Sequence, residues 1–270
     1  MEYKLFKNKI EIYSKQDFNP QHILECGQIF CYQKSKQGYK VFSKDKMAEI
    51  IETQDGYQIL CDDEKYFENF FDLKTDYSQI KNQLSKFDIL KKPIEFGNGI
   101  RILRNDVFEV IISFIISANN NIKRIQKIIN ALKNQCTHGT AFPSLNQLLG
   151  FTVEDFYRLG LGYRAPQLYK CLRQIDEQKI LQWQSLPTSQ LRKNLISLSG
   201  VGSKVADCIL LFGYGRKDVF PVDTWINKMY NMYYSPLNNR EKIANNLVNI
   251  FGNLSGYAQQ YLFYYQRSST

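Results

Sequence analysis

The chain has 270 residues, enough to bury a large core and to form two substructures. It has 35 Lys and Arg residues and 26 Asp and Glu residues, which give a net charge of +9. This charge favours a phosphate-rich partner over an acidic small molecule. A basic surface that serves only solubility would give the same net charge. The N-terminus lacks the apolar core of a signal peptide. The most apolar run, residues 107–118, contains Glu109 and is shorter than the roughly 20 residues that span a bilayer. We therefore expect a buried helix there, and a cytoplasmic protein that is neither secreted nor bound to a membrane.

The cysteines are scattered, with no Cys-x-x-Cys pair and no histidine at ligand spacing. This pattern indicates neither a structural zinc site nor an iron–sulfur cluster, and it predicts free thiols in a reducing compartment. The six residues are Cys26, Cys31, Cys61, Cys136, Cys171 and Cys208.

Residues 1–62 are rich in Tyr, Phe, Ile and Val in short runs that turn-like pieces at 35–38 and 54–56 separate. That alternation predicts an antiparallel sheet with hairpins. The expected strand regions are 3–13, 28–33, 39–43, 47–52 and 58–61.

From residue 63 onward the apolar residues recur at the helical period, and no internal repeat or low-complexity linker is present. Asn105 or Asp106 is the expected N-cap of the apolar helix that ends near residue 118, and Ser144, Thr152, Thr188, Asp223 and Ser255 are expected caps of later helices. The later helices are expected at 121–135, 144–149, 152–159, 166–176, 188–197, 203–213, 223–233, 239–251 and 256–267. The predicted fold class is α+β, with a small N-terminal sheet subdomain (1–104) packed on a larger helical body (105–270).

The stretch 198–208 places Gly200 and Gly202 between two apolar helical segments, at about 188–213. Two glycines one residue apart allow a sharp turn that exposes N–H groups, and the following helix adds its positive N-terminal end, so a helix-hairpin-helix of this kind grips DNA phosphates without reading sequence. An ordinary tight turn with glycine caps is the simpler explanation of a lone Gly-x-Gly. The full order apolar-x-Gly-apolar-Gly-x-x-apolar-Ala favours the phosphate grip.

Lys204 and Asp223 are the candidate catalytic residues. Lys204 lies in the first turn of the second hairpin helix, where a neutral amine could attack a sugar carbon and form a Schiff base. Asp223 follows Pro221-Val222 at an expected helix N-cap, from which a carboxylate could stabilise positive charge on a sugar. A phosphate-contacting or solvated lysine and a purely capping aspartate are the competing interpretations.

With Val219-Phe220-Pro221-Val222-Asp223-Thr224 downstream, this motif resembles the signature of the helix-hairpin-helix Gly-Pro-Asp DNA glycosylase superfamily, in which members with lysine at this position are bifunctional glycosylase/lyases. Four further blocks resemble the eukaryotic-type 8-oxoguanine DNA glycosylases, which also occur in some bacteria. The blocks are residues 25–30, 117–122, 159–165 and 257–263, and the resemblance runs from about residue 18 to the C-terminus.

The resemblance implies a lesion pocket built from Gly27, Cys208, Gln259 and Phe263. In this family the carbonyl matching Gly27 accepts N7–H of 8-oxoguanine, which normal guanine lacks. Gln259 and Phe263, four apart on one helix face, would pair with and stack on the base, with Cys208 on its other side. Taken alone, Gly27 is also explained as a β-turn glycine, and a plain core position is the preferred explanation of Cys208 and Phe263.

The resemblance also assigns residues to the partner strand and to the hairpin. Asn119, Arg124 and Arg164 match residues that hold the orphaned cytosine, and Tyr163 matches a wedge that fills the vacated stack, although each could be a surface or capping residue. The phosphate grip is assigned to Gly200, Val201 and Gly202. No required cofactor is implied, but a structural monovalent cation is expected on the backbone carbonyls of Ile196, Leu198 and Val201.

The chain departs from the family pattern at a few positions. Ser199 stands where proline is common, which should loosen the hairpin slightly, and Trp225 stands where vertebrate members have a phosphate-contacting histidine. Cys31 and Tyr32 replace an Arg-Trp pair.

The resulting hypothesis is a bifunctional, monomeric enzyme that flips 8-oxoguanine out of duplex DNA, preferably opposite cytosine, excises it and cleaves the strand by β-elimination. Another oxidised-purine or mismatch glycosylase on the same fold is the close alternative. A non-catalytic helix-hairpin-helix DNA-binding module is the alternative from a different class, and it would need neither the Lys204–Asp223 pair nor the pocket residues.

Overall fold

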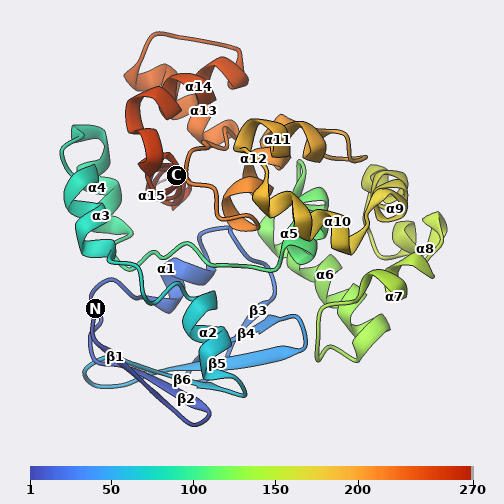
Figure 1. Cartoon of the computed structure of the whole chain (residues 1–270), viewed down its shortest axis with the longest axis horizontal. Helices are drawn as coiled ribbons and strands as arrows, with labels where there is room; N and C mark the ends of the chain where they lie inside the picture. The colour runs from blue at the N-terminus through green and yellow to red at the C-terminus, as the bar shows by residue number, and fades with distance from the viewer. Residues whose placement is uncertain (269–270) are drawn as a thin grey trace.

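The computed structural model describes residues 1–268 and consists of a twisted sheet at one end and a larger helical body at the other (Figure 1). All neighbouring strands are antiparallel, in the order β1-β2-β6-β5-β4-β3. The strands are β1 (Tyr3–Phe6), β2 (Lys9–Ile12), β3 (Tyr32–Lys34), β4 (Gly38–Ser43), β5 (Lys46–Glu52) and β6 (Tyr57–Cys61). The α+β architecture predicted from the sequence is confirmed.

The helices begin with α1 (Pro20–Leu24), α2 (Glu64–Phe70), α3 (Tyr77–Leu84) and α4 (Asp88–Phe96). The central part of the chain forms α5 (Val107–Ser117), α6 (Ile122–Thr137), α7 (Leu145–Leu149), α8 (Val153–Arg158), α9 (Ala165–Gln174) and α10 (Glu177–Gln182). The last part forms α11 (Thr188–Ile196), α12 (Ser203–Phe212), α13 (Thr224–Tyr233), α14 (Arg240–Phe251) and α15 (Ser255–Ser268). Short 3-10 helices lie at Gly162–Arg164, Trp183–Ser185 and Gly252–Leu254.

Two of the expected strand regions differ from the structure. Region 3–13 is a hairpin rather than one run, because the chain turns at Asn8, whose φ is +61°. In region 28–33 only the last two residues belong to a strand, β3. Residues 28–31 do not extend this strand, because the buried Gln28 side chain forms hydrogen bonds with the backbone of the segment 101–103. Helices α1 and α10 were not among the expected segments, and the local signals that the prediction missed are their capping residues, Asn19 and Asp176.

Most helix starts follow from local hydrogen bonds. Asp106 caps α5, and Ser144 and Thr152 each form a reciprocal capping box. The predictions for Thr188 and Ser255 were wrong, because Pro187 holds the cap position of α11 and Ser255 is already helical, its hydroxyl donating to the Gly252 carbonyl.

The core has three apolar clusters. The first lies between the sheet and α2. The second surrounds α5, the apolar run 107–118, whose residues Val107–Ile116 are all buried. In the third, α3 and α4 pack with α13, α14 and α15, so segments far apart in sequence share one core (Figure 1). The buried residues of α5 and α12 belong to the second cluster and those of α15 to the third, so core packing holds these helices in place.

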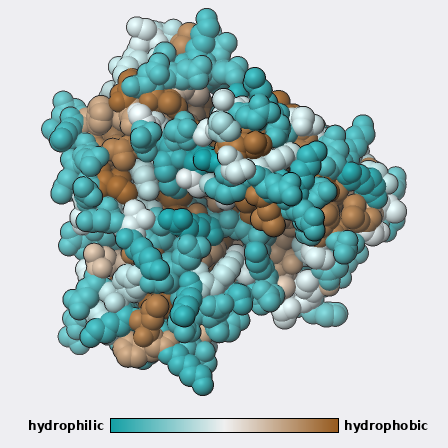
Figure 2. Space-filling model, in the orientation of Figure 1, coloured by the Kyte–Doolittle hydropathy of each residue, from teal (hydrophilic) through white to brown (hydrophobic). Residues whose placement is uncertain are grey.

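The visible face of the molecule is mostly hydrophilic, with hydrophobic residues in small separate groups (Figure 2). Among residues 1–268 no helix is long and apolar enough to cross a membrane. All six cysteines are free thiols, as predicted.

Candidate active site

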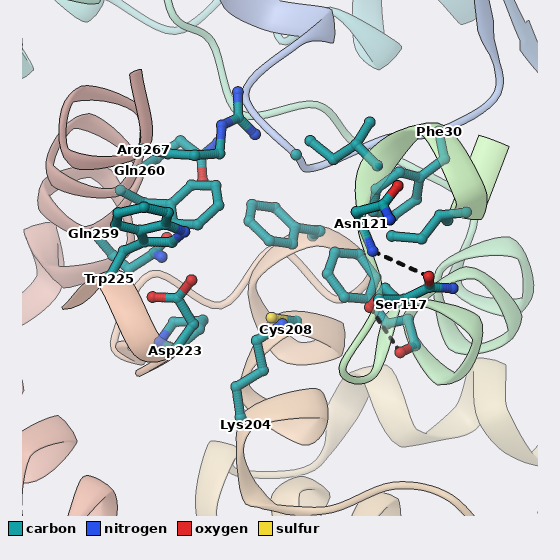
Figure 3. A pocket seen from close by; sticks show the side chains of 18 of the residues that line it. Phe30, Ser117, Asn121, Lys204, Cys208, Asp223, Trp225, Gln259, Gln260 and Arg267 are labelled. Carbon is teal, nitrogen blue, oxygen red and sulfur yellow. Dashed lines mark hydrogen bonds between the residues drawn. The ribbon is translucent and has the colours of Figure 1, made fainter. Parts of the chain in front are cut away.

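A cavity of about 680 Å³ opens between the loop 27–30, α5, the start of α6, α12, the start of α13 and α15 (Figure 3). This volume is within the range of about 300–1,000 Å³ typical of ligand sites. Six residues predicted for the reaction or for the lesion line it together, namely Gly27, Lys204, Cys208, Asp223, Gln259 and Phe263. They come from the loop 27–30, α12, the start of α13 and α15, so the tertiary fold has brought an N-terminal loop and the last helix to the adjacent elements α12 and α13.

Lys204 lies in the first turn of α12 and Asp223 is the N-cap of α13. The Lys204 ammonium is 5.5 Å from the centroid of the Phe114 ring, and its side chain extends beside Cys208 in Figure 3. The Asp223 carboxylate accepts the Ile226 N–H at 2.9 Å and also points into the cavity. The cap therefore fixes the carboxylate on the same cavity as the amine, and capping and catalysis are compatible.

Burial governs the titration of both acidic groups near the amine. It raises the pKa of Asp223, an effect that the Ile226 N–H and the nearby Lys204 charge oppose. Burial likewise raises the pKa of the Cys208 thiol to about 11. Cys208 is thus a neutral thiol at pH 7, suited to packing against a base.

Gly27 and Gln259, both predicted to bind the lesion, line the cavity. Gly27 has φ +82°, and a Cβ atom there would stand 3.1 Å from the Phe263 ring, so only glycine brings this backbone so close to the ring. Gln259 is 4% exposed, and its Oε1 has no hydrogen-bond partner in the described chain. A buried amide oxygen without a partner is unfavourable in the free protein and is available to a ligand.

Several lining residues were not predicted as part of the site. Aromatic rings of Phe30, Phe114 and Phe212 form one side, with Phe114 stacked on Phe212 at 5.5 Å between centroids. Their spacing in the sequence is that of core residues, so no local signal separated them from the core. Trp225, noted only as a departure from the family, also lines the cavity, as do Gln260 and Arg267.

The four residues predicted for the opposite strand lie outside the cavity lining but close to one another. Arg164, 3% exposed, donates to the carbonyls of Ala118 at 2.6 Å, Asn119 at 2.6 Å and Leu161 at 3.2 Å. The Tyr163 hydroxyl also donates to the Ala118 carbonyl, at 3.1 Å.

Arg124 extends from α6 to the same region, where it donates to the Gly160 carbonyl at 3.0 Å. Neighbours of Asn119, namely Asn120 and Asn121, reach the cavity itself. The cluster of Asn119, Arg124, Tyr163 and Arg164 therefore adjoins the cavity, with both arginines engaged by backbone carbonyls.

The hairpin between α11 and α12 is closed tightly at Gly200, which has φ +83°. The Val201 N–H donates to the Leu198 carbonyl at 3.1 Å and is used within the turn. The Ser199 N–H donates to Gln174 Oε1 at 2.7 Å, a bond that proline could not make. It opposes the loosening expected from the loss of proline.

Both parts of the chain match known families. Residues 10–111 match the N-terminal domain of 8-oxoguanine DNA glycosylase, and residues 112–252 match the HhH-GPD superfamily of base excision DNA repair proteins. The chain belongs to the 8-oxoguanine DNA glycosylase family. The predicted family and enzyme class, a bifunctional glycosylase and lyase, are thereby confirmed.

Solved structures and curated relatives agree with this membership. An 8-oxoguanine glycosylase/lyase of Clostridium acetobutylicum, solved in complex with double-stranded DNA containing cytosine opposite 8-oxoguanine, is 36% identical with a TM-score of 0.91, over 100% of this chain and 98% of that one. A probable N-glycosylase/DNA lyase of Methanothermobacter thermautotrophicus is 31% identical over 234 residues, which are 75% of this chain and 74% of the archaeal protein. An N-glycosylase/DNA lyase of Arabidopsis thaliana is 31% identical over 206 residues, 65% of this chain and 56% of the plant protein. The roles of single residues in this chain remain predictions.

Proposed function

We propose that this protein excises 8-oxoguanine opposite cytosine from double-stranded DNA and then cleaves the strand, with Lys204 and Asp223 as its catalytic residues. The observation that carries the proposal is their meeting in one cavity with Gly27, Cys208 and Phe263. A base within a duplex cannot be reached by the amine, so the nucleotide is flipped into the cavity. The energy for flipping comes from contacts with the DNA backbone and the orphaned base.

The chemistry needs an amine and a carboxylate. Lys204 Nζ attacks C1′ as the bond from C1′ to the base nitrogen breaks; the base leaves with the electron pair and takes up a proton, and the amine loses one. Asp223 stabilises the positive charge that grows on the sugar and helps to position the amine. Opening of the sugar ring gives a Schiff base between C1′ and Nζ, and loss of a C2′ proton then expels the 3′ phosphate.

The lesion is recognised from both faces and along one edge. Phe263 on α15 and Cys208 on α12 would hold the base plane between them, and the Gln259 amide would pair with its polar edge. The Gly27 carbonyl accepts N7–H of 8-oxoguanine. It meets a lone pair on guanine, which disfavours the normal base.

The partner strand is held by the neighbouring cluster. We assign the cytosine to Asn119, Arg124 and Arg164, and the stack left by the flipped base to Tyr163, a residue that is 52% exposed. Both arginines donate to backbone carbonyls, so reading cytosine requires them to exchange those bonds or to use their remaining N–H groups.

The hairpin holds the DNA backbone. The amides of Gly200 and Gly202 donate to no described residue and are available to a phosphate, whereas that of Val201 already serves the turn. The carbonyls of Ile196 and Val201 accept no hydrogen bond from the described residues, and Leu198 keeps a second lone pair, so this backbone fits the expected monovalent cation. We also predict that the protein is bacterial, cytoplasmic and monomeric.

Borohydride trapping tests the mechanism. With a duplex containing 8-oxoguanine opposite cytosine, the wild type should form a covalent adduct, Lys204→Gln should form none, and the exposed hairpin variant Lys193→Gln should trap like the wild type. An adduct of unchanged yield in Lys204→Gln would refute the assigned nucleophile. No adduct in the wild type would favour the DNA-binding module, and an adduct only on other lesions or mismatches would favour the alternative glycosylases.

A further inference from the structure

One face of α15 holds the backbone of residues 25–27 with side chains that the proposed reaction does not use. Gln260 is 1% exposed, and its Nε2 donates to the Cys26 carbonyl at 2.9 Å. Arg267, two turns further along, donates through Nη2 to the Glu25 carbonyl. Between them Phe263 lies against Gly27. Two consecutive carbonyls that precede Gly27 are therefore bound by the helix that also carries the lesion-stacking ring.

The residue that follows Gly27 is held from the other direction. The Gln28 Nε2 donates to the carbonyls of Arg101 at 2.7 Å and Ile23 at 2.8 Å, and its Oε1 accepts the Leu103 N–H at 2.8 Å. The Gly27 carbonyl, in contrast, accepts no hydrogen bond from residues 1–268. It is thus an open acceptor between two fixed neighbours.

Glycine by itself would not keep that acceptor in one direction. Without a Cβ, its backbone rotates at low cost, and Gly27 is already at φ +82°. Rotation of the peptide between Cys26 and Gly27 would break the bond from Gln260 to the Cys26 carbonyl and leave a buried carbonyl unpaired, which is unfavourable. The same bond therefore opposes rotation about the backbone next to Gly27.

Burial of the Gln260 amide at this position is unfavourable in free energy. Gln260 is 1% exposed, and its Oε1 has no partner among the described residues. An apolar side chain would fill the space without a desolvated amide oxygen. The Cys26 carbonyl is the group that gains from the presence of Gln260.

We propose that Gln260 is a positioning residue that determines lesion specificity, by fixing the peptide that precedes Gly27 so that the Gly27 carbonyl faces the flipped base. Arg267 supports the same segment through the Glu25 carbonyl. The inference rests on the proposed function, in which that carbonyl accepts N7–H of the lesion. Lys204 and Asp223 lie on other elements, so strand cleavage at a site that already lacks its base does not depend on Gln260.

This independence gives the test. In Gln260→Met, which keeps the length of the side chain but not the donor, the single-turnover excision of 8-oxoguanine should fall at least about tenfold. Cleavage of a duplex with a preformed abasic site should stay within about twofold. Tyr261→Phe is the matched control, because its buried hydroxyl also lacks a partner, and both of its rates should stay within about twofold.

A second variant and a binding measurement cover the case in which Gln260→Met folds poorly. Gln260→Glu keeps the shape and places an acceptor against the Cys26 carbonyl, and it should show the same split between excision and abasic cleavage. In a Lys204→Gln background, which cannot turn over, either Gln260 substitution should reduce the ratio of affinities for 8-oxoguanine and guanine duplexes by at least about fivefold.

The outcomes separate this inference from the proposed function. Unchanged excision in both Gln260 variants, or an equal loss of excision and abasic cleavage, would overturn the positioning role while leaving the proposed function intact. A wild type that cleaves abasic DNA but leaves 8-oxoguanine in place would overturn the proposed function, and this inference with it.

Discussion

The two glycines of the hairpin should respond to alanine in opposite ways. At Gly200, with φ +83°, a Cβ would stand 3.2 Å from both Gln167 Cβ and Ile115 Cγ2. The left-handed backbone and the tight contacts should together cost about 2 kcal/mol, or roughly 4–8 °C in Tm. Gly200→Ala is therefore expected to lower stability.

At Gly202 nothing lies within 4 Å of an added Cβ, and φ is an ordinary −88°. Alanine should gain about 0.4–1 kcal/mol by restricting the unfolded chain and lose a similar amount as an N-cap. The free energy of unfolding should thus change by less than about 0.5 kcal/mol. The new methyl group would instead occupy the space through which a phosphate reaches the turn amides, so the Kd for duplex DNA should rise about tenfold, or about 1.4 kcal/mol.

Thermal unfolding and fluorescence anisotropy with a non-cleavable abasic duplex, at one fixed salt concentration, measure the two effects. Gly215→Ala is the control for backbone strain alone, because Gly215 has φ +68° with no atom within 4 Å and lies outside the site. It should lose about 1 kcal/mol of stability and bind DNA normally. Unchanged DNA affinity in Gly202→Ala, or a loss of stability equal to that of Gly200→Ala, would refute this account of the hairpin.

Three further predictions concern buried charges. Burial raises the pKa of Asp223, and only its carboxylate form stabilises the sugar cation. The single-turnover rate of excision should therefore fall as the pH is lowered, with a midpoint above pH 3.8, and the rate of Asp223→Asn should not show this fall. Burial raises the pKa of Glu109 to about 8 from 4.5, so the folded state loses stability as pH rises between these values. Glu109→Gln, which can still accept the Lys44 N–H, should stabilise the protein most above pH 8 and not below pH 4.5 in denaturant titrations. Arg192→Met should lower the free energy of unfolding in urea by about 3 kcal/mol, because it leaves the buried Asp207 carboxylate without the Arg192 Nε that donates to it at 2.7 Å. The double variant with Asp207→Asn should recover part of this loss. Losses that simply add in the double variant would contradict this explanation.

The features predicted well from the sequence are those made by short-range interactions. Ser144 and Thr152 cap helices through residues three positions away, and Asp223 does the same at the site. The tight turn of the helix-hairpin-helix is also marked locally, because Gly200 has φ +83° and the Val201 N–H donates to the Leu198 carbonyl within the turn. Such features leave a pattern in neighbouring residues, which is why their positions could be predicted.

The errors have the opposite origin. Region 28–33 has the composition of a strand, but a buried Gln28 bound to a segment more than 70 residues away decides its conformation. Phe114 and Phe212 have the sequence spacing of core residues, and only the tertiary structure shows that they line the same cavity as Lys204. No local pattern distinguishes these cases, because the deciding contacts are long-range.

The sequence by itself determined the fold class, the family and the hairpin, because each depends on spacing within a short stretch or on motifs in a recognisable order. Only the tertiary structure decided which helix holds the backbone of residues 25–27, and that Arg164 is engaged by the carbonyls of Ala118 and Asn119 in the free protein. Those contacts join segments 45 to more than 200 residues apart, where burial and hydrogen-bond geometry, rather than local pattern, select the partner.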